Sequence, residues 1–351
     1  MDPRPAATPA DPLRWGFLAT GKIARTVADD LALLPEHRMV AVGSRSAESA
    51  ASFAAEHAPG ATAHGSYEAL VADPGVEVVY VASPHAFHLE HARLALEAGK
   101  HVLVEKPVAL RATDAEEMVA LARERGLFLM EAMWTACHPV VLAVAARLAT
   151  GELGRPRHVR GELGFRVDAE PGDRMLDPAL GASALLDMGI YPLTLAHLLL
   201  GEPVGLTATA DLSERGIDLD VVVTARHADG ALSTSSASMT SWSDQAAAIA
   251  TDRGRITFEG QFHHPSRAWF TPVPDGSDND STLEVAPEEI VPAEPPLGTG
   301  YTHELREVAR CLAAGETESP LVPHARTLAV MRTLDEARAL AGVRFPDDPA
   351  D

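Results

Sequence analysis

Positively charged residues and cysteines are scarce in this chain of 351 residues. Lysine and arginine number 29 against 50 aspartates and glutamates, the formal net charge is −21, and only Lys22, Lys100 and Lys106 are lysines. A protein that binds nucleic acid needs a basic face to displace counterions from phosphate, so the charge argues against a nucleic-acid partner. The two cysteines cannot build a disulfide framework, which favours a reducing compartment, and we expect a cytoplasmic protein.

Long hydrophobic runs are missing as well. No segment approaches the roughly 18 uncharged apolar residues that a membrane-spanning helix needs, so we expect no membrane partner. Residues 1–12 are rich in proline and alanine and lack an apolar core, which indicates a disordered tail rather than a signal sequence. One hydrophobic core stops growing at about 250–300 residues, so the length favours two domains.

Short apolar runs alternate with helical patterns over residues 13–133. Residues 78–81 read Val-Val-Tyr-Val, as expected for a strand buried on both faces. The alternation predicts parallel βαβ units, so the fold class is α/β with an N-terminal Rossmann domain, a doubly wound parallel sheet. The expected strands are 13–18, 39–42, 76–82, 101–105 and 127–132, and the expected helices are 23–34, 47–57, 87–98 and 113–125, the last capped by Thr113 and Asp114.

The pattern changes after residue 133. Strand-like runs with little helix between them follow a strong helix and predict a mostly antiparallel sheet. Residues 134–351 are therefore expected to form a C-terminal α+β domain with a large, mostly antiparallel open sheet. The expected helices are 140–150, 184–200, 302–314 and 324–341, and the expected strands are 157–165, 205–210, 219–226, 231–240, 247–251, 255–258 and 268–271.

The first expected strand runs into a variant of the fingerprint G-x-G-x-x-A in which alanine replaces the first glycine. The remaining glycine lets the backbone approach a pyrophosphate, and the next helix offers free N–H groups and the positive end of its dipole. An ordinary glycine-containing turn is the alternative. The residues expected to bind the dinucleotide here are Ala19, Thr20, Gly21, Lys22 and Ile23.

The end of the second strand distinguishes between the two nicotinamide dinucleotides. An NAD site usually has Asp or Glu here to accept from the ribose 2′-OH, whereas this chain has Ser44 and Arg45. A hydroxyl and a forked guanidinium suit a 2′-phosphate. We therefore expect NADP, with NAD as the second choice. The alternative is a polar loop whose arginine faces solvent.

Three further segments carry reactive side chains. Lys106 ends an expected parallel strand, where ligands of open α/β sheets bind. Lysine is rare in this chain and costly at the buried end of a strand, so a chemical role is favoured. The preceding strand ends in the segment 83–88, Ser-Pro-His-Ala-Phe-His. Asp187 and Tyr191 are four residues apart and so share one face of the strong helix.

Four motifs carry a resemblance to a known family. They are Glu-Lys-Pro at 105–107, P-x-x-x-H at 84–88, M-E-A-M-W-T at 130–135 and L-L-D-x-G-x-Y at 185–191. With these motifs, nearly the whole chain resembles the glucose–fructose oxidoreductase / inositol dehydrogenase (Gfo/Idh/MocA) family of NAD(P)-dependent oxidoreductases. The resemblance is greatest to its dihydrodiol dehydrogenase-like branch, and it implies a homodimer or homotetramer that pairs through the open sheet.

The resemblance also implies three catalytic residues. Lys106 would lie beside the nicotinamide and the reacting oxygen, Tyr191 would exchange the proton, and Asp187 would orient the substrate. A nearby ammonium favours the phenolate of tyrosine, whose pKa is otherwise about 10, and stabilises a developing alkoxide. The implied cofactor contacts are Ser83, Pro84, His85, His88, Glu105, Lys106 and Trp134, and the implied substrate contacts are Lys106, Trp134, Arg174, Asp187 and Tyr191.

Several of these residues have structural alternatives. Tyr191 could be an amphipathic core residue, Asp187 a first-turn carboxylate that interacts with the helix dipole, and Trp134 part of an ordinary core. The chain also departs from the family pattern at 136–138 and 181–183, near the expected pocket. These departures weaken the transfer of a particular substrate but not of the reaction type.

The histidines are not expected to bind metal. His85, His88 and His91 are spaced in threes, but they rotate around a helix and no cysteine or carboxylate completes a ligand set. His263 and His264 are expected to lie in a polar loop.

The expected function is hydride transfer between nicotinamide C4 and a secondary alcohol or ketone carbon. The expected substrate is a small carbohydrate, a cyclic polyol or a dihydrodiol. One alternative is a redox-neutral enzyme that recycles a tightly bound nicotinamide. Another is a regulator that senses NADP without turnover, although Lys106, Asp187 and Tyr191 argue against it.

Overall fold

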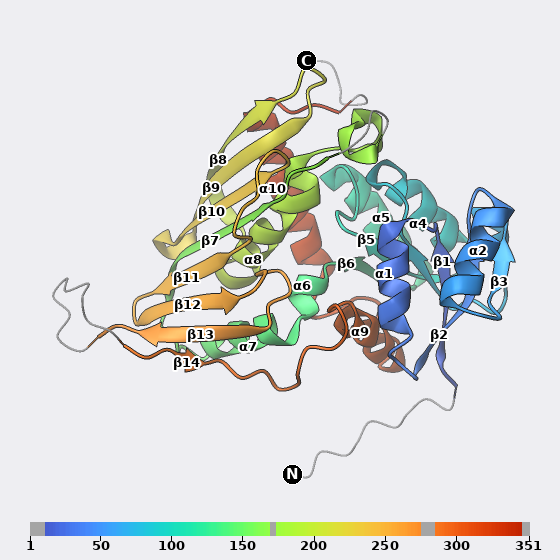
Figure 1. The fold of residues 1–351 in the computed structure, drawn as a ribbon, viewed down its shortest axis with the longest axis horizontal. Helices are drawn as coiled ribbons and strands as arrows, with labels where there is room; N and C mark the ends of the chain where they lie inside the picture. Colours follow the sequence, from blue (N-terminus) through green and yellow to red (C-terminus); the bar gives the residue numbers. More distant parts are fainter. Residues whose placement is uncertain (1–10, 169–172, 275–284, 346–351) are drawn as a thin grey trace, which may run out of the picture.

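The computed structural model describes residues 11–168, 173–274 and 285–345. The expected tail, 1–12, lies outside these ranges except for its last two residues. Two sheets lie on either side of a group of helices, as Figure 1 shows. One sheet is parallel and the other is mostly antiparallel, which confirms the expected fold class.

Residues 13–132 form the parallel sheet and its helices. The strands are β1 (Leu13–Leu18), β2 (His37–Gly43), β3 (Thr62–His64), β4 (Val78–Val81), β5 (His101–Glu105) and β6 (Leu129–Ala132), and the helices are α1 (Lys22–Leu31), α2 (Ala47–His57), α3 (Tyr67–Val71), α4 (His88–Glu97) and α5 (Ala112–Arg125). The strand order is β3-β2-β1-β4-β5-β6. In such a sheet ligands bind outside the carboxyl ends of the strands, where the order reverses between β1 and β4.

The structure differs from the sequence-based expectation at two places in this sheet. It adds β3 and α3, which are too short to give a periodic pattern. The expected cap of α5 is wrong, because Thr113 and Asp114 lie inside the helix. The backbone N–H of Ala112 donates instead to Oδ2 of Asp335 at 2.8 Å. A carboxylate distant in sequence thus replaces a local cap.

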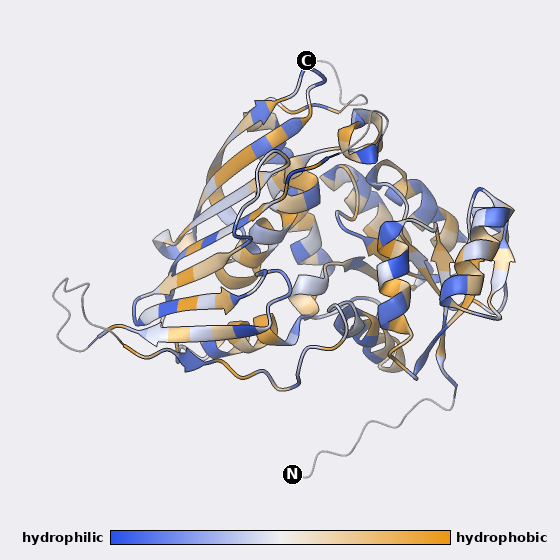
Figure 2. Ribbon diagram, viewed as in Figure 1, coloured by the Kyte–Doolittle hydropathy of each residue, from blue (hydrophilic) through white to orange (hydrophobic). Residues whose placement is uncertain are grey.

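The second sheet has the order β14-β13-β12-β11-β7-β10-β9-β8, and only β7 and β10 pair in parallel. Its strands alternate buried and outward-facing residues, visible as colour alternation in Figure 2, because one face packs on helices and the other does not. The strands are β7 (Pro156–Gly164), β8 (Pro203–Leu212), β9 (Asp218–His227), β10 (Leu232–Ser238), β11 (Ala247–Thr251), β12 (Gly254–Glu259), β13 (Arg267–Pro272) and β14 (Glu288–Glu289).

The helix expected over 184–200 is divided. A π-helical turn, Leu185–Gly189, comes first and α8 follows it. The helical run Pro178–Leu200 is long and apolar enough to cross a membrane, but 83% of its most apolar window is buried, as in the core helix of a globular protein. The helices of this half are α6 (Trp134–Cys137), α7 (Pro139–Ala149), α8 (Ile190–Leu200), α9 (Thr302–Ala313) and α10 (His324–Ala341).

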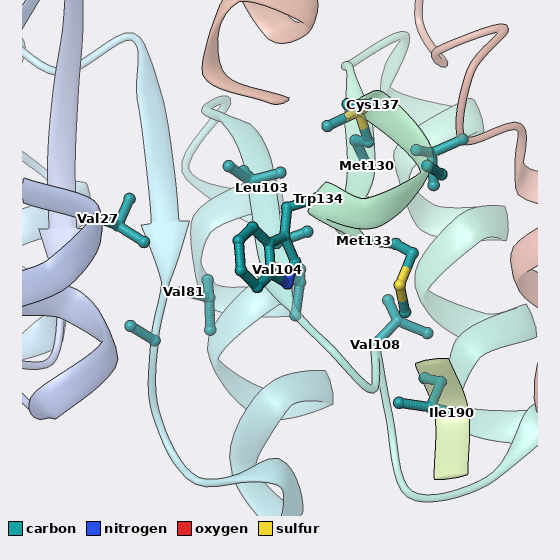
Figure 3. Packing of buried hydrophobic residues seen from close by; sticks show 14 of the residues in the cluster. Val27, Val81, Leu103, Val104, Val108, Met130, Met133, Trp134, Cys137 and Ile190 are labelled. Atoms are coloured by element: carbon teal, nitrogen blue, oxygen red, sulfur yellow. The ribbon is translucent and has the colours of Figure 1, made fainter. Parts of the chain in front are cut away.

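One hydrophobic cluster connects the two sheets. It continues from Val81 and Val104 through Trp134 and Met133 to Ile190 at the start of α8 (Figure 3). The helix α10 strengthens this connection, since its His324 Nε2 lies 2.9 Å from the carbonyl oxygen of Leu129 on β6. Farther along α10, the Thr333 hydroxyl lies 3.0 Å from Nε2 of His197 on α8. The position of α8 relative to the first sheet is therefore fixed by packing and by hydrogen bonds.

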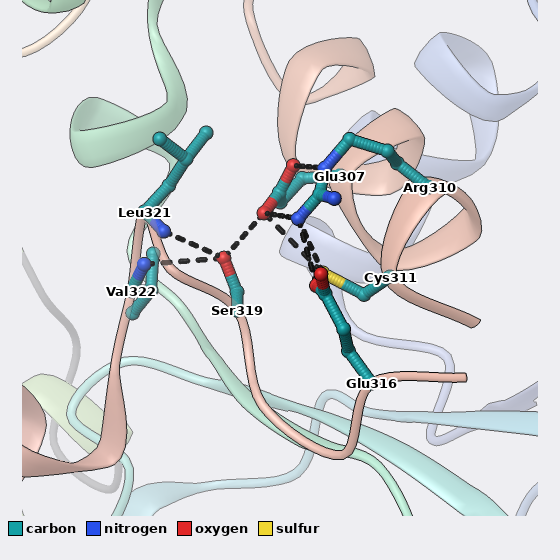
Figure 4. Close-up of polar contacts among 7 residues, drawn as sticks. All are labelled: Glu307, Arg310, Cys311, Glu316, Ser319, Leu321 and Val322. Atoms are coloured by element: carbon teal, nitrogen blue, oxygen red, sulfur yellow. Dashed lines mark hydrogen bonds and ion pairs between the residues drawn. The ribbon is translucent and has the colours of Figure 1, made fainter. Parts of the chain in front are cut away.

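A polar network joins α9 to the segment before α10 (Figure 4). The carboxylate of Glu307 accepts hydrogen bonds from Arg310, Cys311 and Ser319. The Ser319 hydroxyl in turn accepts from the N–H groups of residues 321 and 322. Both cysteines of the chain are free and buried.

Candidate active site

The loop after β1 has the shape of a phosphate-binding turn. Ala19 has a φ of +83°, a left-handed conformation that glycine usually fills, at a cost of about 1–3 kcal/mol. Gly21 precedes α1 without a side-chain capping bond, and a Cβ atom there would meet nothing within 4 Å. The first N–H groups of α1 are therefore open to a ligand, with exposed Lys22 beside them and half-buried Thr20 and Ile23 on either side.

The pair expected to select the cofactor follows β2. Ser44 is buried, and its hydroxyl accepts from the N–H of Ser46 at 3.4 Å, which leaves its own proton free to donate. Arg45 is exposed. It lies near Tyr67: burial raises the pKa of that tyrosine, and the guanidinium opposes the rise. Because β1 and β2 are parallel neighbours, Arg45 lies on the same edge of the sheet as the glycine loop.

His88 joins the ends of β4 and β5. Its side chain is fully buried, Nε2 lies 2.8 Å from the carbonyl oxygen of Ser83, and Nδ1 lies 2.8 Å from that of Pro107. Burial lowers the pKa of His88 to about 4, so at neutral pH it has one proton and donates to one carbonyl at a time. Pro84 begins the short turn between Ser83 and His88. Within the described ranges, no three His, Cys, Asp or Glu side chains are close enough to hold a metal ion.

Lys106 reaches across to the π-helical turn. Its Nζ donates a hydrogen bond to the carbonyl oxygen of Asp187 at 2.7 Å and lies 4.9 Å from the centre of the Tyr191 ring. The residue five positions beyond Asp187 is Pro192, which has no N–H to donate to a carbonyl. The Lys106 ammonium donates to the Asp187 carbonyl from outside the helix. Burial lowers the pKa of Lys106, and the carboxylates of Asp187 and Glu105 oppose this.

Glu105 faces the interior, although a cofactor contact was expected for it. The hydroxyl of Tyr80 donates to its Oε1 at 2.5 Å, and the Lys106 N–H donates to its Oε2 at 3.2 Å. Burial raises the pKa of Glu105, while Tyr80 and Lys106 lower it. Both oxygens are thus occupied by neighbours within the protein.

Asp187 lies between several charged or ionisable side chains. Its Oδ1 lies 3.5 Å from Nε2 of His85 and 3.4 Å from Nη1 of Arg174. Burial raises the pKa of Asp187, but His85, Lys106 and Arg174 lower it, and the net pKa is below the ordinary value. Two buried atoms, Oδ2 of Asp187 and Nδ1 of His85, have no hydrogen-bond partner. Such orphaned groups fit a ligand that brings hydroxyl groups.

Tyr191 holds its phenol as a neutral acid. Its hydroxyl oxygen accepts a hydrogen bond from Nε1 of Trp134 at 3.0 Å, so its own proton remains available. Burial raises the pKa of Tyr191 far above 10, and the Trp134 hydrogen bond opposes the rise only in part. The nearby ammonium of Lys106 was expected to favour the phenolate, but burial disfavours it. The ammonium lies over the ring face, and burial has the larger effect.

Trp134 is the centre of an aromatic cluster. Tyr301 stacks on it at 4.1 Å between ring centres, and His264 stacks on it at 5.1 Å. His263 lies edge-on to Trp134 and 4.9 Å from the ring of Tyr191. His263 and His264 lie in a loop, as expected, but their rings pack against this cluster instead of facing solvent. A Cβ atom at Gly300 would come within 3.0 Å of Trp134, so glycine lets the loop with Tyr301 approach.

Six of the expected residues lie in one connected group of contacts. They are Lys106, Asp187, Tyr191, Trp134, His85 and Arg174, and the glycine loop lies along the same sheet edge as Lys106. His263, His264 and Tyr301 also belong to this group and were not among the site residues predicted from the sequence. The only local signal for Tyr301 was its place two residues before a conspicuous His-Glu pair.

Comparison with family models agrees with this geometry. Residues 13–133 match the model of the oxidoreductase family with an NAD-binding Rossmann fold, and residues 141–257 match the GFO/IDH/MocA C-terminal domain.

Individual relatives cover almost the whole chain. The trans-1,2-dihydrobenzene-1,2-diol dehydrogenase of Sus scrofa is 36% identical over 341 residues, which cover 96% of this chain and 99% of that protein. The D-xylose 1-dehydrogenase (NADP(+)) of Hypocrea jecorina is 32% identical over 371 residues, which cover 95% and 93%. A 3-ketoreductase from Actinomadura kijaniata, solved with NADP and TDP-benzene, has a TM-score of 0.82 at 26% identity and covers 94% of this chain and 98% of that one. An aldose-aldose oxidoreductase from Caulobacter crescentus, at 22% identity and with the same TM-score and coverage, is similar in fold.

Proposed function

The chain belongs to the GFO/IDH/MocA oxidoreductase family, and on that premise we propose which residues carry out its reaction and on what substrate. It is an NAD(P)-dependent oxidoreductase acting on CH–OH groups of sugars or dihydrodiols. The family predicted from the sequence motifs is thereby confirmed.

The dinucleotide site fits NADP. When bound, NADP supplies the hydride acceptor or donor at nicotinamide C4. The uncapped start of α1 and Gly21 would hold the pyrophosphate, and the preference for NADP over NAD is supported by Ser44 and Arg45, which offer donors where a carboxylate would accept from a ribose hydroxyl. The NADP-dependent xylose dehydrogenase and the NADP complex of the ketoreductase agree with this preference.

We assign the proton transfer to Tyr191. Reduction of a ketone needs a proton donor at its oxygen, and a buried phenol whose oxygen already accepts from Trp134 is ready to donate. In oxidation the base is the phenolate of Tyr191, which takes the hydroxyl proton of the alcohol as the hydride leaves its carbon. The ammonium of Lys106, held on the Asp187 carbonyl, stabilises the negative charge that develops on the substrate oxygen.

The proposed substrate is a sugar, a cyclic polyol or a dihydrodiol. The observation that supports it is the pair of orphaned buried atoms, Asp187 Oδ2 and His85 Nδ1, which can accept from or donate to ligand hydroxyls. The aromatic cluster around Trp134 and His263 lies beside Tyr191 and would give such a molecule an apolar wall next to the polar groups.

The wider proposals are five. Residues 13–133 would act as the dinucleotide-binding domain and residues 134–351 as the domain for substrate binding and oligomerisation. The open face of the second sheet supports a homodimer or homotetramer. Two free cysteines support a cytoplasmic location, and the net charge of −21 supports the absence of a nucleic-acid partner. A mostly buried apolar helix agrees with the absence of a membrane partner.

The test is turnover with NADP and NADPH on aldoses, cyclic polyols, trans-dihydrodiols and the matching ketones. Lys106→Ala and Tyr191→Phe should bind NADPH as the wild type does, by fluorescence titration, but lose turnover roughly 100-fold or more. Lys100→Ala is the matched control, because that lysine donates to the carbonyls of Asp73 and Val76, and it should keep full turnover. Normal turnover in Lys106→Ala would remove that lysine from the mechanism. Tightly co-purifying cofactor with no net change in nicotinamide absorbance would indicate redox-neutral chemistry instead.

A further inference from the structure

A buried carboxylate behind the active site has partners that the proposed reaction does not use directly. Glu131 lies on β6, paired in register with Val104 of β5, and is 5% exposed. Its Oε1 accepts from the backbone N–H of Val108 at 3.0 Å. Its Oε2 accepts from the hydroxyl of Thr327 on α10 at 3.1 Å. One side chain thus connects the segment after Lys106 to the helix that also contacts α8.

The Val108 contact bears on the position of Lys106. Val108 is two residues beyond the lysine, and the intervening Pro107 is held from the opposite direction, with its carbonyl oxygen 2.8 Å from His88. The ammonium of Lys106 must reach the carbonyl oxygen of Asp187 in the π-helical turn before α8. A shift of about 1 Å in a catalytic group can reduce turnover roughly 100-fold, so the anchoring of this segment matters.

We propose that Glu131 is a positioning residue for Lys106, which holds the segment 106–108 against α10 and keeps a negative charge near the lysine ammonium. The proposal rests on the function assigned to Lys106 above. It adds to that function a residue that does not touch the substrate. The hydroxyl of Thr327 on α10 binds Glu131, and Glu131 binds the backbone two residues after Lys106.

The charged groups around Glu131 determine whether its carboxylate raises or lowers the pKa of Lys106. Lys106 and Glu105 at the end of β5 and Glu304 on α9 interact with Glu131 electrostatically, and the neutral Thr327 of α10 donates a hydrogen bond to it. Burial raises the pKa of Glu131 to about 7, with the Val108 and Thr327 hydrogen bonds opposing. The ionised carboxylate raises the pKa of Lys106, which burial lowers. Loss of its charge should therefore make Lys106 easier to deprotonate.

The first experiment needs no activity. The chain has three lysines, so competitive acetylation of the amines over a pH series, read out by peptide mass spectrometry, follows Lys106 with Lys22 and Lys100 as internal references. In Glu131→Gln the pKa of Lys106 should fall while the two references stay unchanged. Glu307→Gln, an equally buried carboxylate whose partners are Arg310, Cys311 and Ser319, should leave all three lysines unchanged. An unaltered Lys106 titration in Glu131→Gln would overturn the electrostatic part of the proposal.

The second experiment separates geometry from charge. The glutamine of Glu131→Gln can still accept from Val108 and donate to Thr327, so kcat at its optimal pH should stay near that of the wild type, with the alkaline limb moved to lower pH. Glu131→Leu should lower kcat roughly 100-fold with little change in the KM for NADP. Thr327→Val should lower kcat less, and Thr327→Ser should restore it.

Normal kcat in both Glu131→Leu and Thr327→Val would overturn the positioning role. If Glu131→Leu does not fold, the kcat of Thr327→Val compared with that of Thr327→Ser still tests the positioning role. A wild-type protein without turnover would contradict the proposed function alone, because the labelling experiment still tests the influence of Glu131 on Lys106.

Discussion

Asp30 is the residue whose replacement tests the docking of α9 most directly. It lies on α1 and is 3% exposed, yet its carboxylate accepts from the backbone N–H groups of residues 299, 300, 301 and 302, at distances of 2.9 to 3.3 Å. These groups form the turn that starts α9 and carries Tyr301, which stacks on Trp134. The side chain of Asp30 on α1 thus caps the start of α9.

The expected loss follows from these contacts. Removing one partner of a buried charged network costs about 3–5 kcal/mol, and a single hydrogen bond to a charged group contributes about 1.5–3 kcal/mol. Asp30→Ala should therefore lower the free energy of unfolding by about 3–5 kcal/mol, since one turn of backbone can relax in part toward water. Asp30→Asn keeps one acceptor oxygen but no charge and should lose about 1–3 kcal/mol.

Urea unfolding followed by tryptophan fluorescence measures both variants. Asp29→Asn is the matched control on the same helix, because Asp29 is exposed and contacts His57 only at the surface, and it should change stability by less than about 0.5 kcal/mol. A loss in Asp30→Ala below about 1 kcal/mol would refute the reasoning, because four buried N–H groups would then have found other partners at little cost.

Three further predictions use other parts of the molecule. Arg45→Ser should raise the KM for NADP roughly 10- to 100-fold, the loss of a charge-assisted contact, and leave the KM for NAD nearly unchanged; equal changes in both would contradict a 2′-phosphate site. His85, His138 and His263 have pKa values lowered to about 3 by burial, so they stay neutral in the folded protein while the unfolded chain takes up protons below about pH 6.5. The free energy of unfolding should therefore be unaffected by these histidines above that pH. Between about pH 6.5 and pH 3 it should fall by up to about 1.4 kcal/mol per pH unit for each histidine. Urea titrations at pH 7.5 and 5.5 measure this fall, and equal stability at both pH values would contradict the prediction. Ser319→Ala removes a hydroxyl that donates to Glu307 and accepts from two N–H groups, and should cost about 1–3 kcal/mol by the same assay, whereas no loss would indicate that water replaces it.

The first sheet and the family could be predicted from the sequence because their signals are local. A strand buried on both faces must be apolar along its length, so β4 is visible in its own residues. Lys106 could be singled out because a lysine at a strand end has few structural uses in a chain that otherwise relies on arginine. The variant glycine loop was also readable, since its place between a strand and a helix limits what its residues can do.

Contacts between distant segments had no such signal. Asp335 caps α5 from 223 residues away, and Asp30 caps the start of α9 from an equally remote helix. No periodicity or propensity reports such a partner, because a carboxylate on a helix looks the same whether it faces water or a buried N–H group.

The sequence by itself determined the fold class and the family and predicted the reactive side chains, because apolar periodicity and motif order are properties of the chain. Only the tertiary structure decided their chemical state. Tyr191 is a neutral acid because packing buries it against Trp134, and Lys106 meets the Asp187 carbonyl because the fold brings the end of β5 against the π-helical turn before α8. Burial and electrostatic environment depend on what surrounds a group in space, and neighbours in space are set by the folded chain rather than by neighbours in sequence.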